Sequence, residues 1–90
     1  MYEIKLSARA EKDLVKLKKS EPNAFKKAET LLLEIAEHPY TGTGKPKPLG
    51  NDRAGQWSRK ISDKHRIVYI VDDEIVVVFI ITASGHYGDK

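Results

Sequence analysis

Apolar and polar residues alternate at two periods along the chain, and the change of period divides it into elements. Tyr2–Leu6 reads Tyr-Glu-Ile-Lys-Leu, the period-two pattern of a short strand with one buried face. Ser7 offers an N-cap for a helix over residues 8–19, in which apolar residues recur at helical spacing. A proline-containing break precedes a second helix, which we expect to end near His38 because Pro39 disfavours helical geometry in the residue before it.

The second half of the chain has the period of strands. Tyr40–Asn51 is rich in Gly, Thr and Pro and predicts a loop, and three strand-like runs follow it at Gly55–Ile61, His65–Val71 and Ile75–Ala83. The order β-α-α-β-β-β predicts an α+β fold in which two N-terminal helices pack on one face of a twisted antiparallel sheet. Ninety residues form a single domain, 1–90, and the other face of the sheet is then available for a ligand.

The connection between the first two of these runs fixes a register. A three-residue turn, Ser62-Asp63-Lys64, places Ile61 opposite His65 and Lys60 opposite Arg66. Directly opposed like charges destabilise a hairpin, so a fold that keeps them together is expected to hold an anion such as phosphate between them. The alternative is a register slip of one residue, which would separate the two cations.

Alternation also assigns the faces of the first run. Trp57, Arg59 and Ile61 share one face, and Ser58 and Lys60 share the other. We expect Trp57 to belong to the core rather than to stack on a base.

Charge is concentrated in the middle of the chain. The net charge is +3, but residues 42–66 contain seven basic and two acidic residues, a net +5. Such a concentration favours a polyanion partner through counterion release, although a basic face that contacts only water would give the same charge pattern. If the partner is RNA, candidate binding residues outside the reacting centre are Lys45, Arg59 and Lys64.

Several other classes of site and location are excluded or disfavoured. The chain has no cysteine, and its three histidines have no ligand-like spacing, so we expect no metal and no cofactor. The segment Gly42-Thr-Gly-Lys45 lacks the residues that a nucleotide-binding P-loop requires. No apolar run is long enough to span a bilayer and no secretory signal opens the chain, so we expect a cytoplasmic protein without a membrane partner.

The C-terminal segment ends in a histidine and a tyrosine. The turn at Asp72-Asp73-Glu74 is short, so the last strand must run antiparallel to the one before it and return beside Arg66. That topology brings His86 and Tyr87 toward Lys60 and Arg66. A frayed tail is the alternative.

Three runs of sequence carry a resemblance to a known family. They are Gly44-Lys-Pro-Lys-Pro-Leu49, Gly55-Gln-Trp-Ser-Arg-Lys-Ile61 with His65-Arg-Ile-Val-Tyr69, and the closing His86-Tyr87. Together they resemble the YoeB (Txe) branch of the RelE toxin superfamily over nearly the whole chain. The resemblance implies a compact α+β fold of the microbial ribonuclease type.

The resemblance also implies a function. Members of the family are toxins of type II toxin–antitoxin systems, endoribonucleases that cleave mRNA in the ribosomal A site without a metal and so inhibit translation. The implied partners are a cognate antitoxin of the YefM kind, the 70S ribosome and mRNA, and a homodimer is kept among the candidate assemblies. By resemblance, the active-site positions fall on Lys47, Lys60, Arg66, His86 and Tyr87.

Two of these positions depart from the best-known family pattern. Lys47 stands where that pattern has the glutamate of Lys-Pro-Glu-Pro, and Lys60 replaces the second arginine of Trp-Ser-Arg-Arg. A lysine of ordinary pKa, about 10.4, is protonated at neutral pH and cannot accept the 2′-hydroxyl proton. Lys47 would have to lose its proton to act as the base, and the ribosome or the RNA itself are the alternative sources.

The other roles can be assigned as hypotheses. His86 is the expected general acid, because an imidazole titrates near pH 6.5 and can carry and release a proton at neutral pH. Arg66 and Lys60 would bind the scissile phosphate, and Tyr87 would orient it or stack on a base. The rival hypothesis is a non-catalytic module of the same fold that binds RNA or an antitoxin. A DNA-binding repressor ranks last because no recognition-helix pattern is present.

Overall fold

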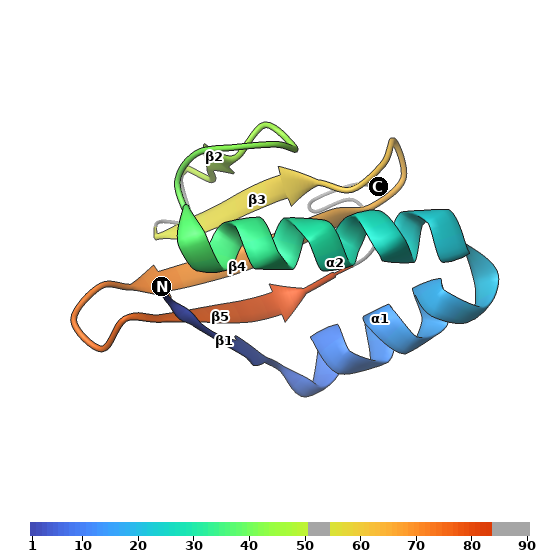
Figure 1. Ribbon diagram of the computed structural model, residues 1–90, viewed down its shortest axis with the longest axis horizontal. Coiled ribbons are helices and arrows are strands. Elements are labelled where there is room, and N and C mark those ends of the chain that lie inside the picture. Colours follow the sequence, from blue (N-terminus) through green and yellow to red (C-terminus); the bar gives the residue numbers. More distant parts are fainter. Residues whose placement is uncertain (51–54, 84–90) are drawn as a thin grey trace.

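The structure is a computed structural model, and it describes residues 1–50 and 55–83. Within these ranges, two helices and five strands follow one another (Figure 1). They are β1 (Glu3–Leu6), α1 (Ala8–Ser20), α2 (Pro22–Glu37), β2 (Lys47–Pro48), β3 (Gln56–Lys60), β4 (Arg66–Asp72) and β5 (Val77–Thr82). The predicted elements are all present, and β2 adds a two-residue strand inside the segment that the sequence predicted as a loop.

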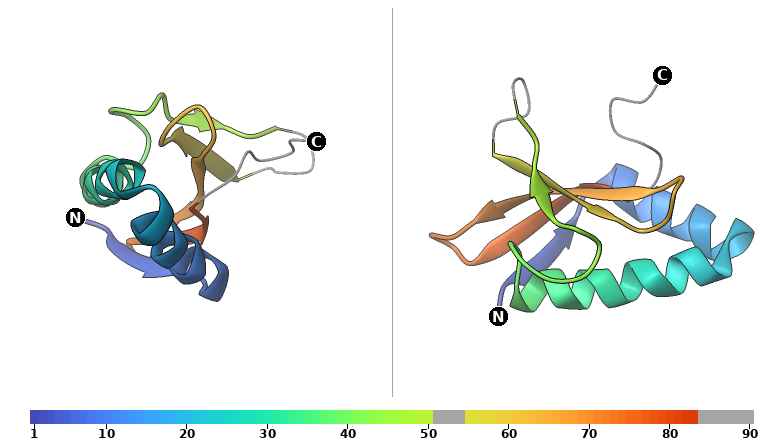
Figure 2. Two further views of the ribbon diagram at one scale, coloured as in Figure 1. Left: turned by 90° about the vertical axis from the view of Figure 1, so that its right-hand side faces the viewer. Right: turned by 90° about the horizontal axis from the view of Figure 1, so that it is seen from above.

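The five strands form one sheet in the order β1-β5-β4-β3-β2, and both helices cover the same face of it (Figures 1 and 2). The predicted α+β architecture is confirmed. One strand pair departs from the expected antiparallel arrangement: β1 lies parallel to β5, so the sheet is mixed. No hairpin joins β1 to β5, since most of the chain separates them, and turn geometry therefore places no constraint on the direction of β1.

The helices begin and end for local reasons. Ser7 Oγ accepts a hydrogen bond from Ala10 N at 2.9 Å, which caps α1, and donates to Ile81 O at 2.6 Å, which ties the cap to β5. α2 ends at Glu37, one residue before the predicted boundary at His38. No described helix has the length and apolarity needed to cross a bilayer.

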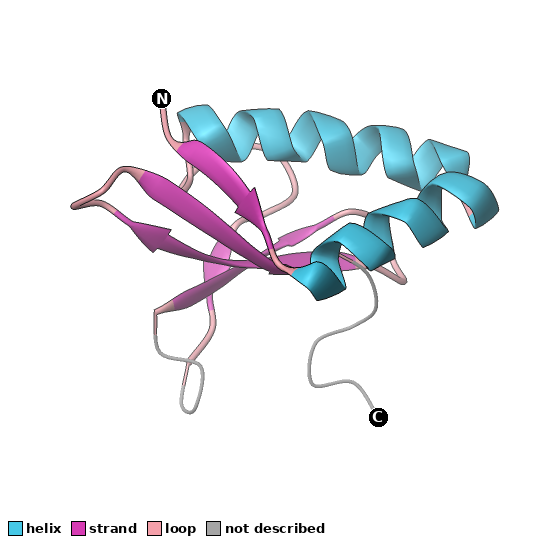
Figure 3. Cartoon of the chain, turned by 90° about the horizontal axis from the view of Figure 1, so that it is seen from below, coloured by secondary structure: helices cyan, strands magenta, loops and turns pink. Residues whose placement is uncertain are grey.

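The core lies between the helices and the covered face of the sheet (Figure 3). Leu17 of α1 and Leu31 and Ile35 of α2 pack with Tyr69 of β4 and Ile80 of β5, and all five are buried. Burial of a large aliphatic or aromatic side chain contributes on the order of 1.5–3 kcal/mol, so this shared core is what orients the sheet. Because side chains alternate along a strand, burial of Tyr69 and Ile80 on this face leaves their neighbours on the opposite face.

A second contact cluster joins the N-terminus, the loop after α2 and the β4–β5 turn. The Asp73 carboxylate accepts hydrogen bonds from the hydroxyl groups of Tyr2 and Tyr40, the latter at 2.8 Å. These bonds lower the pKa of Asp73, whereas partial burial and the Asp73 bond raise the pKa of Tyr40 to about 12. The Tyr40 ring also lies 5.0 Å from that of Trp57, which packs at the edge of the core as expected.

Candidate active site

The face of the sheet opposite the helices carries a set of cations, which we call the cationic face and define by Lys47, Lys60 and Arg66. Lys60 of β3 lies opposite Arg66 of β4, which is the register predicted from the turn between them. Lys47 of β2 lies opposite Ser58, two residues before Lys60 on the same strand. Paired residues and residues two apart share a face, so the three cations come from three adjacent strands to one surface.

The three cations differ in their surroundings. The Lys60 ammonium lies 2.9 Å from the Asp63 carboxylate, and its side chain is 39% exposed. Lys47 is exposed and Arg66 is partly buried, and neither forms an ion pair with any residue that the structure describes. Arg66 is the residue best placed to accept a phosphate, because no described carboxylate competes for its guanidinium.

Ser58 lies between Lys47 and Val68 in the same row of the sheet. The residue is buried, and its hydroxyl has no hydrogen-bond partner in the described part of the chain. A buried hydroxyl without a partner is costly, and such groups are commoner at functional sites than elsewhere.

Strand β5 runs toward the Arg66 end of β4, as the sequence predicted. Thr82 pairs with Val68, two residues from Arg66, and the register changes between Val68 and Tyr69 so that Ile81 is the extra residue of a bulge. Ala83 is the last described residue. The predicted catalytic residues His86 and Tyr87 lie outside the described residues.

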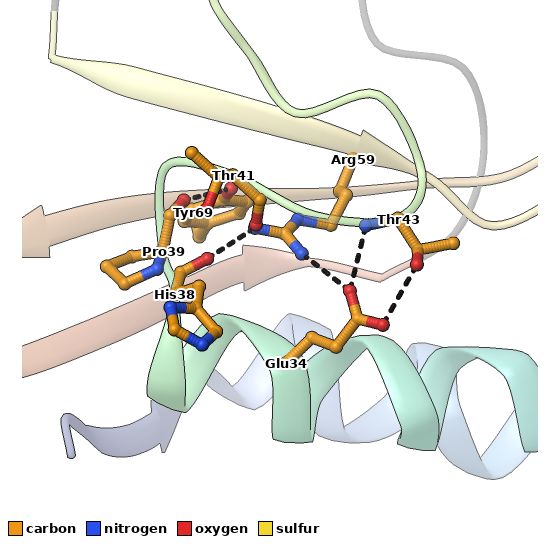
Figure 4. A network of polar contacts seen from close by, with 7 residues as sticks. All are labelled: Glu34, His38, Pro39, Thr41, Thr43, Arg59 and Tyr69. Atoms are coloured by element: carbon orange, nitrogen blue, oxygen red, sulfur yellow. Dashed lines mark hydrogen bonds and ion pairs between the residues drawn. The ribbon is translucent and has the colours of Figure 1, made fainter.

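Arg59 lies on the core face of β3, which alternation had assigned to it together with Trp57, and not on a surface that could bind RNA. Its side chain is fully buried on the helix side of β3, and its guanidinium contacts protein groups (Figure 4). Nη2 donates to the carbonyls of His38 and Thr41 at 2.8 and 2.9 Å, and Nη1 lies 3.3 Å from Glu34 Oε1. The prediction that Arg59 binds RNA is therefore wrong: a guanidinium that satisfies loop carbonyls inside the protein cannot reach a phosphate.

Glu34 completes the same network, which we call the loop anchor and define by Glu34, Thr43 and Arg59. The Glu34 carboxylate accepts hydrogen bonds from Thr43 N and Thr43 Oγ, both at 2.9 Å. These bonds lower the pKa of Glu34, and the Arg59 charge lowers it further. Glu34 has no distinguishing signal in the sequence, because it resembles any other charged residue on the outer face of a helix.

The loop anchor fixes the segment that leads into β2. Tyr69 OH donates to Pro39 O at 2.7 Å, and Lys60 N donates to Gly44 O at 2.7 Å. The segment from α2 to Gly44 is thus bonded to β3 and β4 at both ends. Lys45 follows directly, exposed and with φ 52°, rather than in the extended conformation expected of a residue before proline.

Lys64 and His65 lie at the β3–β4 turn and share one acidic partner. His65 Nε2 lies 2.9 Å and Lys64 Nζ 3.7 Å from Glu21 Oε2, and the hydrogen bond from His65 is the main reason that the pKa of Glu21 is lowered. Lys64 keeps an exposed side chain and stays a candidate RNA contact. His65, to which the sequence analysis assigned no chemistry, joins the turn to the junction of α1 and α2.

Within the described ranges, no group of three His, Asp or Glu side chains is close enough to hold a metal ion. The cationic face presents positive charge on the sheet surface that the helices leave uncovered, and the loop anchor, on the helix side, fixes the segment that leads into β2.

Comparison with known proteins gives the same family by sequence and by structure. Residues 6–87 match the family described as the YoeB-like toxin of bacterial type II toxin–antitoxin systems. Toxin YoeB of Streptomyces coelicolor is 42% identical over 76 residues, which are 83% of this chain and 87% of that protein.

Two solved structures from Staphylococcus aureus are also similar, each at 32% identity. A YoeB dimer has a TM-score of 0.84 and is covered to 98%, with 96% of this chain aligned. A heterotetrameric YoeB–YefM toxin–antitoxin complex has a TM-score of 0.82 and is covered to 99%, with 97% of this chain aligned. The family match spans nearly the whole chain and the fold agrees with it, so this protein belongs to the YoeB-like toxins of bacterial type II toxin–antitoxin systems.

Proposed function

We propose that this toxin is an endoribonuclease that cleaves mRNA in the ribosomal A site and thereby inhibits translation. The observation that carries the proposal is the Lys60–Arg66 pair, held face to face across β3 and β4 with Lys47 on the same surface. A sheet that keeps like charges opposed gains stability when an anion lies between them, and a phosphodiester supplies that anion.

The proposed reaction is attack by the RNA 2′-hydroxyl on the adjacent phosphorus, with departure of the 5′-oxygen. Arg66 and Lys60 bind the non-bridging phosphate oxygens and stabilise the charge that builds on them in the transition state. Each such contact contributes on the order of 2.7–4 kcal/mol to barrier lowering in comparable anion sites. The chain supplies these charges from two rigid strands, so little reorganisation accompanies the reaction.

The two proton transfers of the reaction are assigned to His86, which lies outside the described residues, and to Lys47. His86 donates a proton to the leaving 5′-oxygen, and Tyr87 orients the phosphate or stacks on a base. Lys47, which lies on the cationic face, accepts the 2′-hydroxyl proton as the base. The ribosome or the RNA is the other source of the base.

The proposed partners follow from the family. The S. aureus relative is solved in complex with YefM and also as a dimer. We propose a cognate antitoxin of that kind for this chain, with a homodimer as its own assembly. A protein that acts on translating ribosomes would work in the cytoplasm.

The test compares the wild type with His86→Gln and Arg66→Gln on ribosomes that carry a defined mRNA. Primer extension should show new RNA ends in the A site with the wild type, and both variants should lower their yield by at least 100-fold, the effect of losing one acid or one transition-state contact. Unchanged cleavage by His86→Gln would exclude His86 as the acid. Absence of new ends with the wild type would leave a module that binds without cleaving.

Lys47→Glu tests the base separately, since it restores the carboxylate of the best-known family pattern. If Lys47 substitutes for that carboxylate, the variant should cleave as well as or better than the wild type. Lost cleavage would show that the positive charge of Lys47, and not proton acceptance, is what the reaction requires.

A further inference from the structure

A groove of about 440 Å³ lies where α2, the loop before β2 and the β3–β4 turn meet. Its charged lining consists of Lys27 from α2, Lys45 from the loop, and Lys60 and Asp63 from the end of β3 and the turn. These segments are far apart in the sequence and come together only in the folded chain. Three ammonium groups and one carboxylate give the groove an excess of positive charge.

The wall that carries Lys45 is held in place. Gly44 O accepts the hydrogen bond from Lys60 N, and the loop anchor fixes the residues just before it. Lys45 itself has φ 52°, a left-handed conformation that a residue with a Cβ rarely adopts. Such backbone strain persists only where the surroundings enforce it, and it is frequent at binding sites.

The lining favours an anion over an apolar ligand. The one large apolar side chain of the groove, Ile61, is 2% exposed and belongs to the core. A polypeptide partner would be expected to insert an aromatic or aliphatic anchor, and no exposed aromatic or branched aliphatic side chain lines this groove to pack against one. Lysines act as point charges toward phosphate, which makes a phosphodiester the fitting ligand.

We propose that this groove binds a backbone phosphate of RNA, next in line to the phosphate on the cationic face. Lys60 connects the two places, since it lines the groove and also lies opposite Arg66. A strand that passes over the end of β3 would meet Arg66 and Lys60 first and Lys45 and Lys27 next. The inference deepens the proposed function and rests on it for the identity of the strand. It adds Lys27, which no sequence motif contains.

Adjacent lysines on α2 supply a matched pair of variants. Lys26 and Lys27 are both exposed and carry the same charge on the same helix. Lys27 lines the groove, whereas Lys26 lines an apolar depression between α2 and β1 with Ile4 and Leu33. Lys27→Gln and Lys26→Gln therefore change net charge and helix propensity equally and differ only in place.

The experiment measures affinity for RNA against salt concentration, using a short single-stranded RNA made uncleavable by 2′-deoxy sugars and, separately, 70S ribosomes with a vacant A site. Each phosphate contact contributes about 0.7 to the slope of log affinity against log salt for a single strand. Lys27→Gln should lower the slope by about that amount and weaken binding at low salt. Lys26→Gln should leave the slope as it is in the wild type.

Each result bears on the groove. A smaller slope for Lys27→Gln with the free RNA would assign the bound phosphate to mRNA. A smaller slope with ribosomes alone would assign it to ribosomal RNA. Either result supports a phosphate site in the groove. Equal slopes for the two variants would overturn the proposal, as would a loss of antitoxin affinity in Lys27→Gln with RNA binding unchanged. Lys45→Gln provides a second groove variant should Lys27→Gln unfold, which thermal melting would reveal.

These outcomes can be told apart from failure of the proposed function, because the RNA probe is not cut. A slope difference between the two variants, without any cleavage by the wild type, would support phosphate binding in the groove and contradict the proposed nuclease activity. Cleavage that depends on His86, with no slope difference, would support the nuclease activity and contradict phosphate binding in the groove.

Discussion

Arg59 Nη1 lies 3.3 Å from Glu34 Oε1, in an ion pair whose cationic side is fully buried and whose anionic side is 34% exposed. The pair joins α2 to β3 across the loop that runs between them in sequence. It explains why an arginine on a strand of a basic protein faces inward: the loop turns two carbonyls toward the interior, and the guanidinium is the group that satisfies them.

Replacing Arg59 should therefore destabilise the fold. Arg59→Met fills the space but leaves the carbonyls of His38 and Thr41 without a donor, and we expect a loss of roughly 3 kcal/mol in the free energy of unfolding. Arg59→Lys keeps the charge without the planar fork and should lose less. Urea denaturation measures both. A value for Arg59→Met within about 0.5 kcal/mol of the wild type, the range of ordinary surface substitutions, would contradict this account.

Alanine substitutions at three glycines can distinguish the cost of backbone strain from that of steric clash. A Cβ at Gly44 would lie 2.7 Å from Arg59 Cγ and 2.9 Å from Lys60 O, at φ +86°. Gly55 has φ +85° with nothing within 4 Å, and Gly50 has neither feature. Gly55→Ala should cost about 1–2 kcal/mol of stability, Gly44→Ala more, and Gly50→Ala nothing.

Chemical denaturation of the three alanine variants checks this order. Gly44→Ala should also lower RNA affinity, because the clash displaces the loop that presents Lys45. Equal stability of Gly44→Ala and Gly55→Ala would mean that the loop moves freely and that the loop anchor does not fix it.

Arg66→Gln should lower cleavage activity and raise the stability of the folded protein. It removes the like-charge contact with Lys60 and so should raise the free energy of unfolding of the RNA-free protein by about 0.2–1 kcal/mol, while cleavage falls. Lys16→Gln, an exposed charge change on α1, is the control for net charge. Thermal unfolding at low salt gives the measurement, and a drop in stability for Arg66→Gln would show that the pair is not repulsive.

Asp73 should make stability depend on acid pH. Its hydrogen bonds from Tyr2 and Tyr40 lower its pKa in the folded state, so its contribution is present above the ordinary aspartate pKa of about 3.9 and is lost as pH falls through the lowered value. Asp73→Asn should remove that part of the acid dependence. Unfolding curves of the two proteins from neutral to acid pH should converge at low pH, and a constant difference between them would contradict the assignment.

Local patterns in the sequence determined the helices, the strands and the β3–β4 register, because each depends on a period or a turn within a few residues. The three-residue turn was sufficient to place Lys60 opposite Arg66, and Pro39 was sufficient to end α2. The family motif identified the candidate chemistry at His86 and Tyr87, but both stay predictions because they lie outside the described residues.

Only the tertiary structure decided what the remaining charged side chains contact. Arg59 and Lys60 are neighbours of the same charge, yet one is buried against loop carbonyls and the other lies on the opposite face, since the use of a cation depends on groups distant in the chain. The parallel pairing of β1 with β5, the role of Glu34 and the position of Lys27 in the groove have the same origin. Alternation in a sequence assigns a side chain to a face, but long-range packing decides whether that face holds protein, water or a ligand.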